Sequence, residues 1–141
     1  MADPRLAVAS EGIGALDDSH FIDDSTITYS ATSNGGSASV GLAVTLSAAN
    51  TIELVGDGEA VMGKLLHVEA DGLATVQIKG GMTLPGGVGS YTVGKKIVGA
   101  VDALAAEGYI REVDTSDADE LGRARGYTKD ASVTTAIVVM L

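Results

Sequence analysis

Residues 56–64 read GDGEAVMGK and have the G-x-x-x-x-G-K spacing of a nucleotide-binding loop. Such a loop holds phosphate with its backbone amides. It also needs Ser or Thr after the lysine to reach Mg²⁺, and a helix that begins at the loop. Here Leu65 follows Lys64, and the turn-forming pair at 71–72 leaves no room for that helix. Glu59 would also place a negative charge beside the phosphates. We therefore predict a turn that leads into a strand, with Lys64 as a strand side chain.

The side chains that could bind a metal ion are few and scattered. The two histidines, His20 and His67, have no partner at metal-ligand spacing, and the chain has no cysteine. The acidic stretch DTSDADELG at 114–122 misses the calcium-loop pattern, because Ala118 falls where an oxygen ligand is needed. The start of a helix explains this stretch better. We expect no metal and no cofactor, and we expect His67 to be a hydrogen-bonded residue on the inner face of a strand pair.

Patterns for acid–base or nucleophilic catalysis are also missing from the sequence. The stretch GVGSYTVG at 87–94 has no glycine two places after its serine, so it is not a nucleophile elbow. Two acidic pairs, Asp17–Asp18 and Asp23–Asp24, lie in a segment without a clear period, whereas acid–base catalysis requires a rigid frame. We predict that the protein has no catalytic residue and is not an enzyme.

The composition restricts the class of protein. Of 141 residues, 9 are basic and 19 are acidic, and the net charge of −10 repels nucleic acid and anionic lipid. The sequence has no run of about 18 apolar residues and no secretory signal pattern, so we expect a chain made in a cytoplasm without a membrane partner. Aromatic residues make up only 4% of the chain. We therefore expect an aliphatic core whose stability is shared with a partner or with other copies of the chain.

The elements that position these side chains are mostly short strands between glycine-rich turns. The clearest signal is a hairpin around Asp71-Gly72, a dipeptide preferred in two-residue turns. With such a turn, Val68 faces Thr75 and Leu66 faces Gln77. The mixed character of this face makes Leu66 and Val68 candidates for a subunit interface, with coverage by another layer of the same domain as the alternative.

Further strands are predicted by alternation and β-branched content at 25–30, 38–46, 51–55, 96–101, 109–113 and 134–141. The stretch 94–108 also fits a helical period, but Gly99 weakens a helix, so we favour a strand at 96–101. One short helix is predicted at 115–126, with Thr115 or Ser116 as its N-terminal cap.

The predicted domain organisation is simple. Residues 1–25 show no convincing period and are expected to be an irregular N-terminal arm. Residues 26–141 are expected to form a single compact β domain. The predicted fold class is mainly β, a small barrel or sandwich with one short helix.

Two segments carry a resemblance to a known family. IELVGDGEAVMGKLLHVEADGLATVQIKGGMTLPGG and, after a gap, ARGYTKDASVTTAIVVML resemble the small decoration (cement) proteins of tailed-bacteriophage heads. The shared features are the glycine-flanked entry GDGEAV, the hairpin VEADGLATVQIKG and an Ala-Arg-Gly step before a closing apolar strand. The resemblance covers roughly residues 50–141 and rests on structural turns.

The resemblance implies a compact, β-tulip-like domain that binds the outside of an expanded capsid. There, usually as a homotrimer, it would bridge neighbouring major capsid subunits, so its expected location is the outer surface of the virion. An N-terminal arm that becomes ordered on the shell is also implied. The apolar residues of that arm are the candidate capsid contacts: Leu6, Val8, Ile13, Leu16, Phe21 and Ile22. The alternative is a free-standing β-barrel binding module for a small ligand or host-surface glycan, against which the absence of Trp argues.

Overall fold

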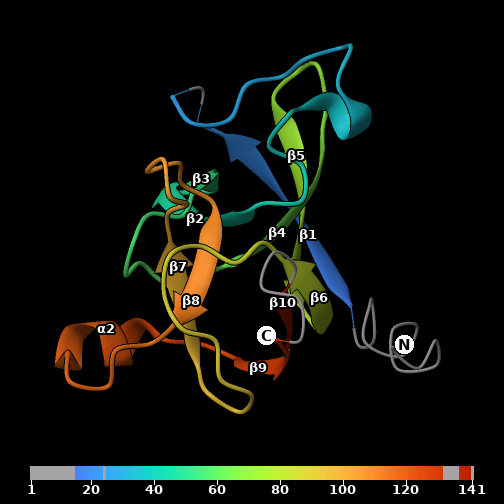
Figure 1. The fold of residues 1–141 in the computed structure, drawn as a ribbon. Coiled ribbons are helices and arrows are strands. Elements are labelled where there is room, and N and C mark those ends of the chain that lie inside the picture. The colour runs from blue at the N-terminus through green and yellow to red at the C-terminus, as the bar shows by residue number, and fades with distance from the viewer. Residues whose placement is uncertain (1–14, 24, 132–136, 141) are drawn as a thin grey trace.

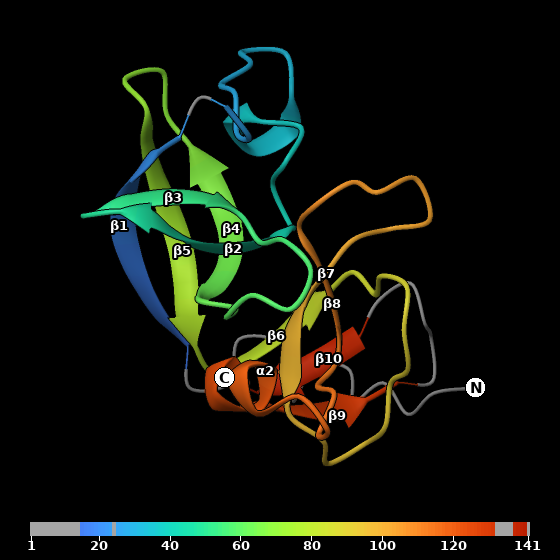
Figure 2. The same cartoon turned by 90° about the vertical axis from the view of Figure 1, so that its left-hand side faces the viewer.

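The structure is a computed structural model that describes residues 15–23, 25–131 and 137–140. Its main element is a closed β-barrel with the strand order β1-β3-β2-β4-β5 (Figures 1 and 2). The barrel strands are β1 (Leu16–Ile22), β2 (Ala43–Ala48), β3 (Thr51–Leu54), β4 (Gly63–Val68) and β5 (Leu73–Lys79). The predicted fold class, mainly β with a small barrel, is confirmed.

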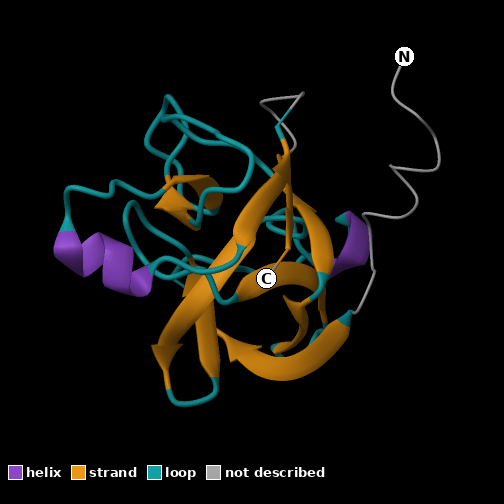
Figure 3. Ribbon diagram, turned by 90° about the horizontal axis from the view of Figure 1, so that it is seen from below, coloured by secondary structure: helices purple, strands orange, loops and turns teal. Residues whose placement is uncertain are grey.

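The other strands form two smaller sheets beside the barrel. One has the order β6-β10-β9, and the other pairs β7 with β8. Their bounds are β6 (Gly81–Leu84), β7 (Ile97–Ala100), β8 (Tyr109–Glu112), β9 (Tyr127–Asp130) and β10 (Ile137–Met140). The short helices η1 (Asn34–Gly36) and α2 (Ala118–Arg123) lie on opposite sides of the strands (Figure 3).

Buried apolar side chains form two clusters. The barrel cluster contains Ile27, Val44, Ile52, Leu65, Val68, Ala74 and Val76. The second cluster draws on the barrel and on both smaller sheets, and contains Ala43, Val55, Val61, Met82, Leu84, Ile97 and Ile110. None of these fully packed residues is aromatic, so the expected aliphatic core is confirmed. Tyr91 packs against the second cluster from its edge.

The predicted β4–β5 hairpin is present, but the register predicted for it is wrong. Its loop has three residues instead of two, because Glu69 N donates to Leu73 O (2.8 Å) and Gly72 N donates to Glu69 O (3.0 Å). Gly72 adopts φ +84°, the left-handed conformation that the last position of such a loop requires. Val68 consequently pairs with Ala74 instead of Thr75.

The shifted register changes which hairpin side chains face the core. Val68 is 1% exposed inside the barrel, so the prediction that it belongs to a subunit interface is wrong. Leu66 is half-buried, and its assignment to an interface stays a prediction. His67 is exposed, which corrects its expected place on an inner face. The register also shifts between Leu65 and His67, where the strand is irregular.

The N-terminal arm predicted over residues 1–25 also needs correction. Residues Leu16–Ile22 form β1, which pairs antiparallel with β5 and, at its C-terminal end, parallel with β3. The β domain therefore includes residues before 26. The pattern was not visible in the sequence because His20 is the one buried residue of this strand, so the expected apolar alternation is missing.

Most of the remaining predicted elements are present. The strands predicted at 51–55, 96–101 and 109–113 are β3, β7 and β8, and β10 falls within 134–141. Residues 25–30 form a turn and irregular chain, so the strand predicted there is wrong. The predicted helix is α2, but its cap is Asp117, whose carboxylate accepts from Asp119 N and Glu120 N.

Candidate functional site

The loop that resembles a nucleotide-binding loop connects β3 to β4 and uses its amides within the fold. Gly58 N donates to Gly99 O (2.9 Å), and Gly99 N donates to Glu59 O (2.8 Å). Gly56 N donates to the Glu59 carboxylate (2.8 Å). These amides are therefore not available to a phosphate, and Lys64 lies on β4. The predicted turn that leads into a strand is confirmed.

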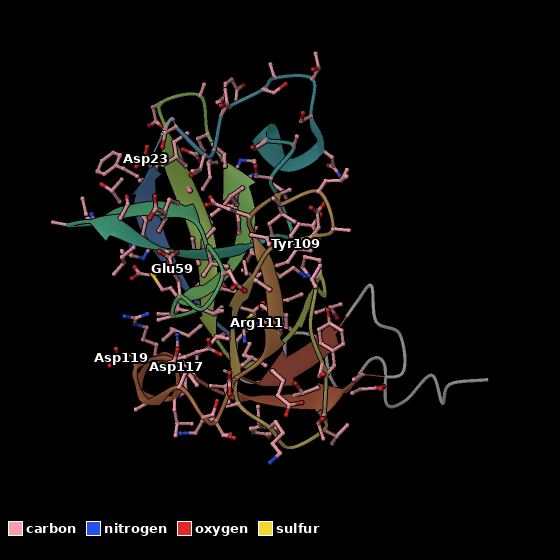
Figure 4. The ribbon with its side chains drawn as sticks, turned by 60° about the vertical axis from the view of Figure 1, so that its left-hand side comes forward. Asp23, Glu59, Tyr109, Arg111, Asp117 and Asp119 are labelled. Atoms are coloured by element: carbon pink, nitrogen blue, oxygen red, sulfur yellow. The ribbon has the colours of Figure 1, made fainter. Side chains whose placement is uncertain are left out.

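The most extensively bonded side chain connected to this loop is Arg111 of β8. Its Nη1 and Nη2 donate to the two carboxylate oxygens of Glu120, at 2.7 and 2.8 Å. Its Nε donates to Asp57 Oδ1 (2.9 Å), and Nη1 also donates to Glu112 O (3.0 Å). Arg111 therefore joins the β3–β4 loop, β8 and helix α2. In the view of Figure 4, Arg111 is labelled between Glu59 of that loop and Asp117 at the start of α2.

The electrostatics of this network keep its members charged. The hydrogen bond from Arg111 is the main reason that the pKa of Glu120 lies below its usual value, and Asp114 N (2.6 Å) adds to the effect. The bond to Glu120 in turn raises the pKa of Arg111. The side chains of Arg111 and Glu120 are only 16% and 9% exposed, so the ion pair is largely removed from water. A permanently ionised pair of this kind stabilises a fold and does not exchange protons near neutral pH.

A second arginine connects the barrel to the chain that follows α2. Arg125 Nη1 donates to Met62 O (2.7 Å), and Nη2 donates to Ile78 O (2.7 Å). The backbone of Arg125 exchanges two hydrogen bonds with Ile97 of β7. One residue thus joins the end of the β3–β4 loop, β5 and β7. This contact gives the Ala-Arg-Gly step of the sequence a structural explanation.

Two carboxylates of the acidic stretch after β8, those of Asp114 and Asp117, cap local turns. Asp114 Oδ1 accepts from Ser116 N (2.9 Å) and Ser116 Oγ (2.6 Å), which lowers the pKa of Asp114. Asp117 caps α2. No group of three or more metal-ligating side chains occurs in residues 15–23, 25–131 and 137–140.

The described residues place the two histidines in different settings. His20 of β1 is 7% exposed, and its Nε2 lies 3.2 Å from Asp18 Oδ2, whereas His67 of β4 is exposed. The structure therefore gives no shared site to the two imidazoles.

The candidate contact residues differ in exposure. Leu16 is 53% exposed and Phe21 is 52% exposed, both on β1. Ile22 is half-buried and packs against the barrel cluster, so it contributes mainly to the fold. The remaining predicted contacts, Leu6, Val8 and Ile13, lie outside the described residues.

The edge of β1 adds backbone groups to these apolar side chains. In the described chain, Leu16–His20 pair with β5 on one side and with no strand on the other. Ser19 N donates to the Asp18 carboxylate (2.9 Å) instead of to a neighbouring strand. An open strand edge beside exposed Leu16 and Phe21 is a surface to which an extended segment can add.

The fold and these contacts define a small β-barrel protein with internally bonded charges and exposed apolar side chains on its outer face. Searches against protein-family models, curated proteins and solved structures gave no match. Within the described part of the chain, none of the helices is long and apolar enough to cross a membrane.

Proposed function

We propose that this protein binds the outside of an expanded phage capsid and stabilises it by bridging neighbouring major capsid subunits. The observation that carries the proposal is β1, which combines an open edge with two half-exposed apolar side chains, Leu16 and Phe21. The resemblance of residues 50–141 to phage decoration proteins supplies the class of partner. A homotrimer is the proposed assembly, and the outer surface of the virion is the proposed location.

The proposed mechanism is repetition of modest contacts. Each contact contributes little, but a symmetric oligomer that engages several capsid subunits at once gains effective concentration at each further site. Bound protein stabilises the expanded shell because it binds that state preferentially. The internally bonded Arg111 network fits a protein that must keep its shape under mechanical strain. The acidic surface of the chain fits a position away from the packaged DNA.

The proposal is tested by cosedimentation with expanded heads that lack their decoration. The wild-type protein should bind at a fixed, saturable ratio to capsid subunits. Phe21→Ser should raise the half-saturating concentration by about 10-fold, since one large apolar side chain is lost from the contact. Tyr127→Ser is the matched control, because Tyr127 is 46% exposed on a different sheet, and it should leave binding unchanged.

Two results would contradict the proposal. One is failure of the wild-type protein to bind the heads of its own phage. The other is an equal loss of binding in the Phe21 and Tyr127 variants, which would remove β1 as the contact. Sedimentation equilibrium of the free protein tests the proposed trimer separately. Deletion of residues 1–25 is a poor variant for this experiment, because it removes a strand of the barrel.

A second candidate function has one observation in its favour. A hollow of about 420 Å³ lies between the chain before β2 and the tip of the β4–β5 hairpin, and Tyr29, His67 and Glu69 line it. An aromatic face beside a carboxylate and an imidazole is suited to a saccharide. Binding of the wild-type protein to a host-surface glycan array, lost in Tyr29→Ala, would support this alternative.

A further inference from the structure

The most exposed large apolar side chain among the described residues lies at the tip of the β7–β8 loop. Leu104 is 90% exposed, whereas Leu65 and Leu84 are fully buried. Residues 103–107 are all exposed, so the whole tip of the loop stands away from the core. Isolated exposed leucines are common. The backbone around this one, however, is fixed by several hydrogen bonds.

The side chain of Asp102 organises the loop. Its Oδ1 accepts from Leu104 N (2.8 Å) and from Ala106 N (2.9 Å). Backbone bonds close the same turn, because Asp102 N donates to Ala106 O (2.9 Å) and Ala105 N donates to Asp102 O (3.0 Å). Four hydrogen bonds thus fix the five residues that present Leu104.

The loop also contains backbone strain. Ala105 adopts φ +64°, the left-handed region that side chains with a Cβ rarely enter. Such a conformation persists only where the surrounding bonds enforce it, and strained positions concentrate at functional surfaces. A fixed loop that presents an apolar side chain loses little entropy when that side chain enters a pocket.

The charges near the loop identify the kind of pocket. Glu107 is exposed at the C-terminal end of the loop. Three hollows on the described surface are lined by carboxylates: Glu69 in one, Glu112 and Asp114 in another, and Glu53 and Glu59 in the third, and an arginine also lines the second and the third. The chain has a net charge of −10, so a second copy docked at this loop would bring a mainly acidic surface to Glu107. A partner with basic groups around an apolar pocket is complementary.

We propose that Leu104 is an anchor that inserts into an apolar pocket on a capsid subunit, with Lys or Arg residues at the pocket rim to pair with Glu107. This inference rests on the proposed function and adds a second contact to it. Figure 2 shows the β7–β8 loop projecting on the side of the molecule opposite to β1. Two anchors on opposite sides reach two different subunits, which is the arrangement that bridging requires.

The test compares Leu104→Ser with Val93→Ser in the cosedimentation assay. Val93 is 62% exposed on another loop, so both changes should leave the melting temperature within about 2 °C of the wild type. Leu104→Ser should raise the half-saturating concentration by about 10-fold or more, and Val93→Ser by less than about 2-fold. Glu107→Lys should also weaken binding, because it reverses the charge that faces the basic rim.

The possible results separate this inference from the proposed function. Wild-type binding that Leu104→Ser does not weaken would overturn the anchor and leave the capsid function standing. Loss of self-association in Leu104→Ser, seen by sedimentation equilibrium, with unchanged affinity for heads would also overturn it, since the pocket would then belong to another copy. Failure of the wild-type protein to bind heads would overturn both.

Discussion

Substitution of Glu120 by Gln tests whether the Arg111 network holds the fold together. The carboxylate accepts two hydrogen bonds from Arg111 and one from Asp114 N, whereas an amide has a single acceptor oxygen. Hydrogen bonds to charged groups each contribute about 1.5–3 kcal/mol, and Asp57 remains to pair part of the Arg111 charge. We therefore expect the free energy of unfolding to fall by about 2–4 kcal/mol. For a chain of this size, the melting temperature should fall by about 10 °C.

The assay is urea unfolding followed by circular dichroism, together with calorimetry for the melting temperature. Asp119→Asn is the matched control, because Asp119 lies exposed in the first turn of the same helix. It should cost less than about 1 kcal/mol, the usual size of a helix-dipole effect. Equal stabilities of Glu120→Gln and the wild type would refute the reasoning, since the pair would then contribute nothing beyond its own desolvation.

Three further outcomes are expected from the same measurements. Arg111 lowers the folded-state pKa of Glu120. The ionised Glu120 carboxylate therefore contributes its full stabilisation above the unfolded pKa of about 4.3, and this stabilisation is lost as pH falls through the lower folded pKa. In urea titrations at a series of pH values, the stability difference between Glu120→Gln and the wild type should therefore be constant above about pH 6 and shrink in acid. A difference that stays constant at every pH would contradict this. Gly36→Ala should destabilise by more than about 2 kcal/mol, since a Cβ there would clash with Val68 O and φ is +87°; an unchanged urea midpoint would show that the loop adjusts. Gly122→Ala should stabilise by about 1 kcal/mol, because it lies in α2 with open space around it; calorimetry that shows no rise in melting temperature would count against it.

The sequence was sufficient for the fold class and for several strands. Segments such as 51–55 and 109–113 combine β-branched residues with turn residues on both sides, and these local signals survive in the structure as β3 and β8. The hairpin register was not predictable, because Asp71-Gly72 suits a two-residue turn and a three-residue loop alike. The choice between them depends on which side chains the barrel buries, and that is decided by distant strands.

The Arg111 network could not be predicted from local sequence patterns for the same reason. Asp57 and Arg111 are 54 positions apart, and nothing near either residue indicates the other. One signal was present: with only 9 basic residues against 19 acidic ones, an arginine inside a β-strand is a candidate partner for buried carboxylates. Leu104 was missed because it follows the strand favoured at 96–101, and in the alternative helical interpretation of 94–108 it falls on the apolar face. In the structure it lies in a turn.

Arg111 and Arg125 bear on how the two proposed capsid contacts, Phe21 and Leu104, would work together. Leu104 is carried by the loop that leads into β8, while Phe21 is on β1 of the barrel. Arg111 of β8 bonds to Asp57 in a loop between two barrel strands, and Arg125 bonds to the carbonyls of Met62, just before β4, and Ile78 of β5. A bridge between capsid subunits resists their separation only if its two ends cannot move apart. On this argument Glu120→Gln, at a temperature where it remains folded, should bind undecorated heads almost as well as the wild type. Heads saturated with it should nevertheless break at a lower temperature, and equal protection by the two proteins would show that Arg111 stabilises the fold without transmitting load.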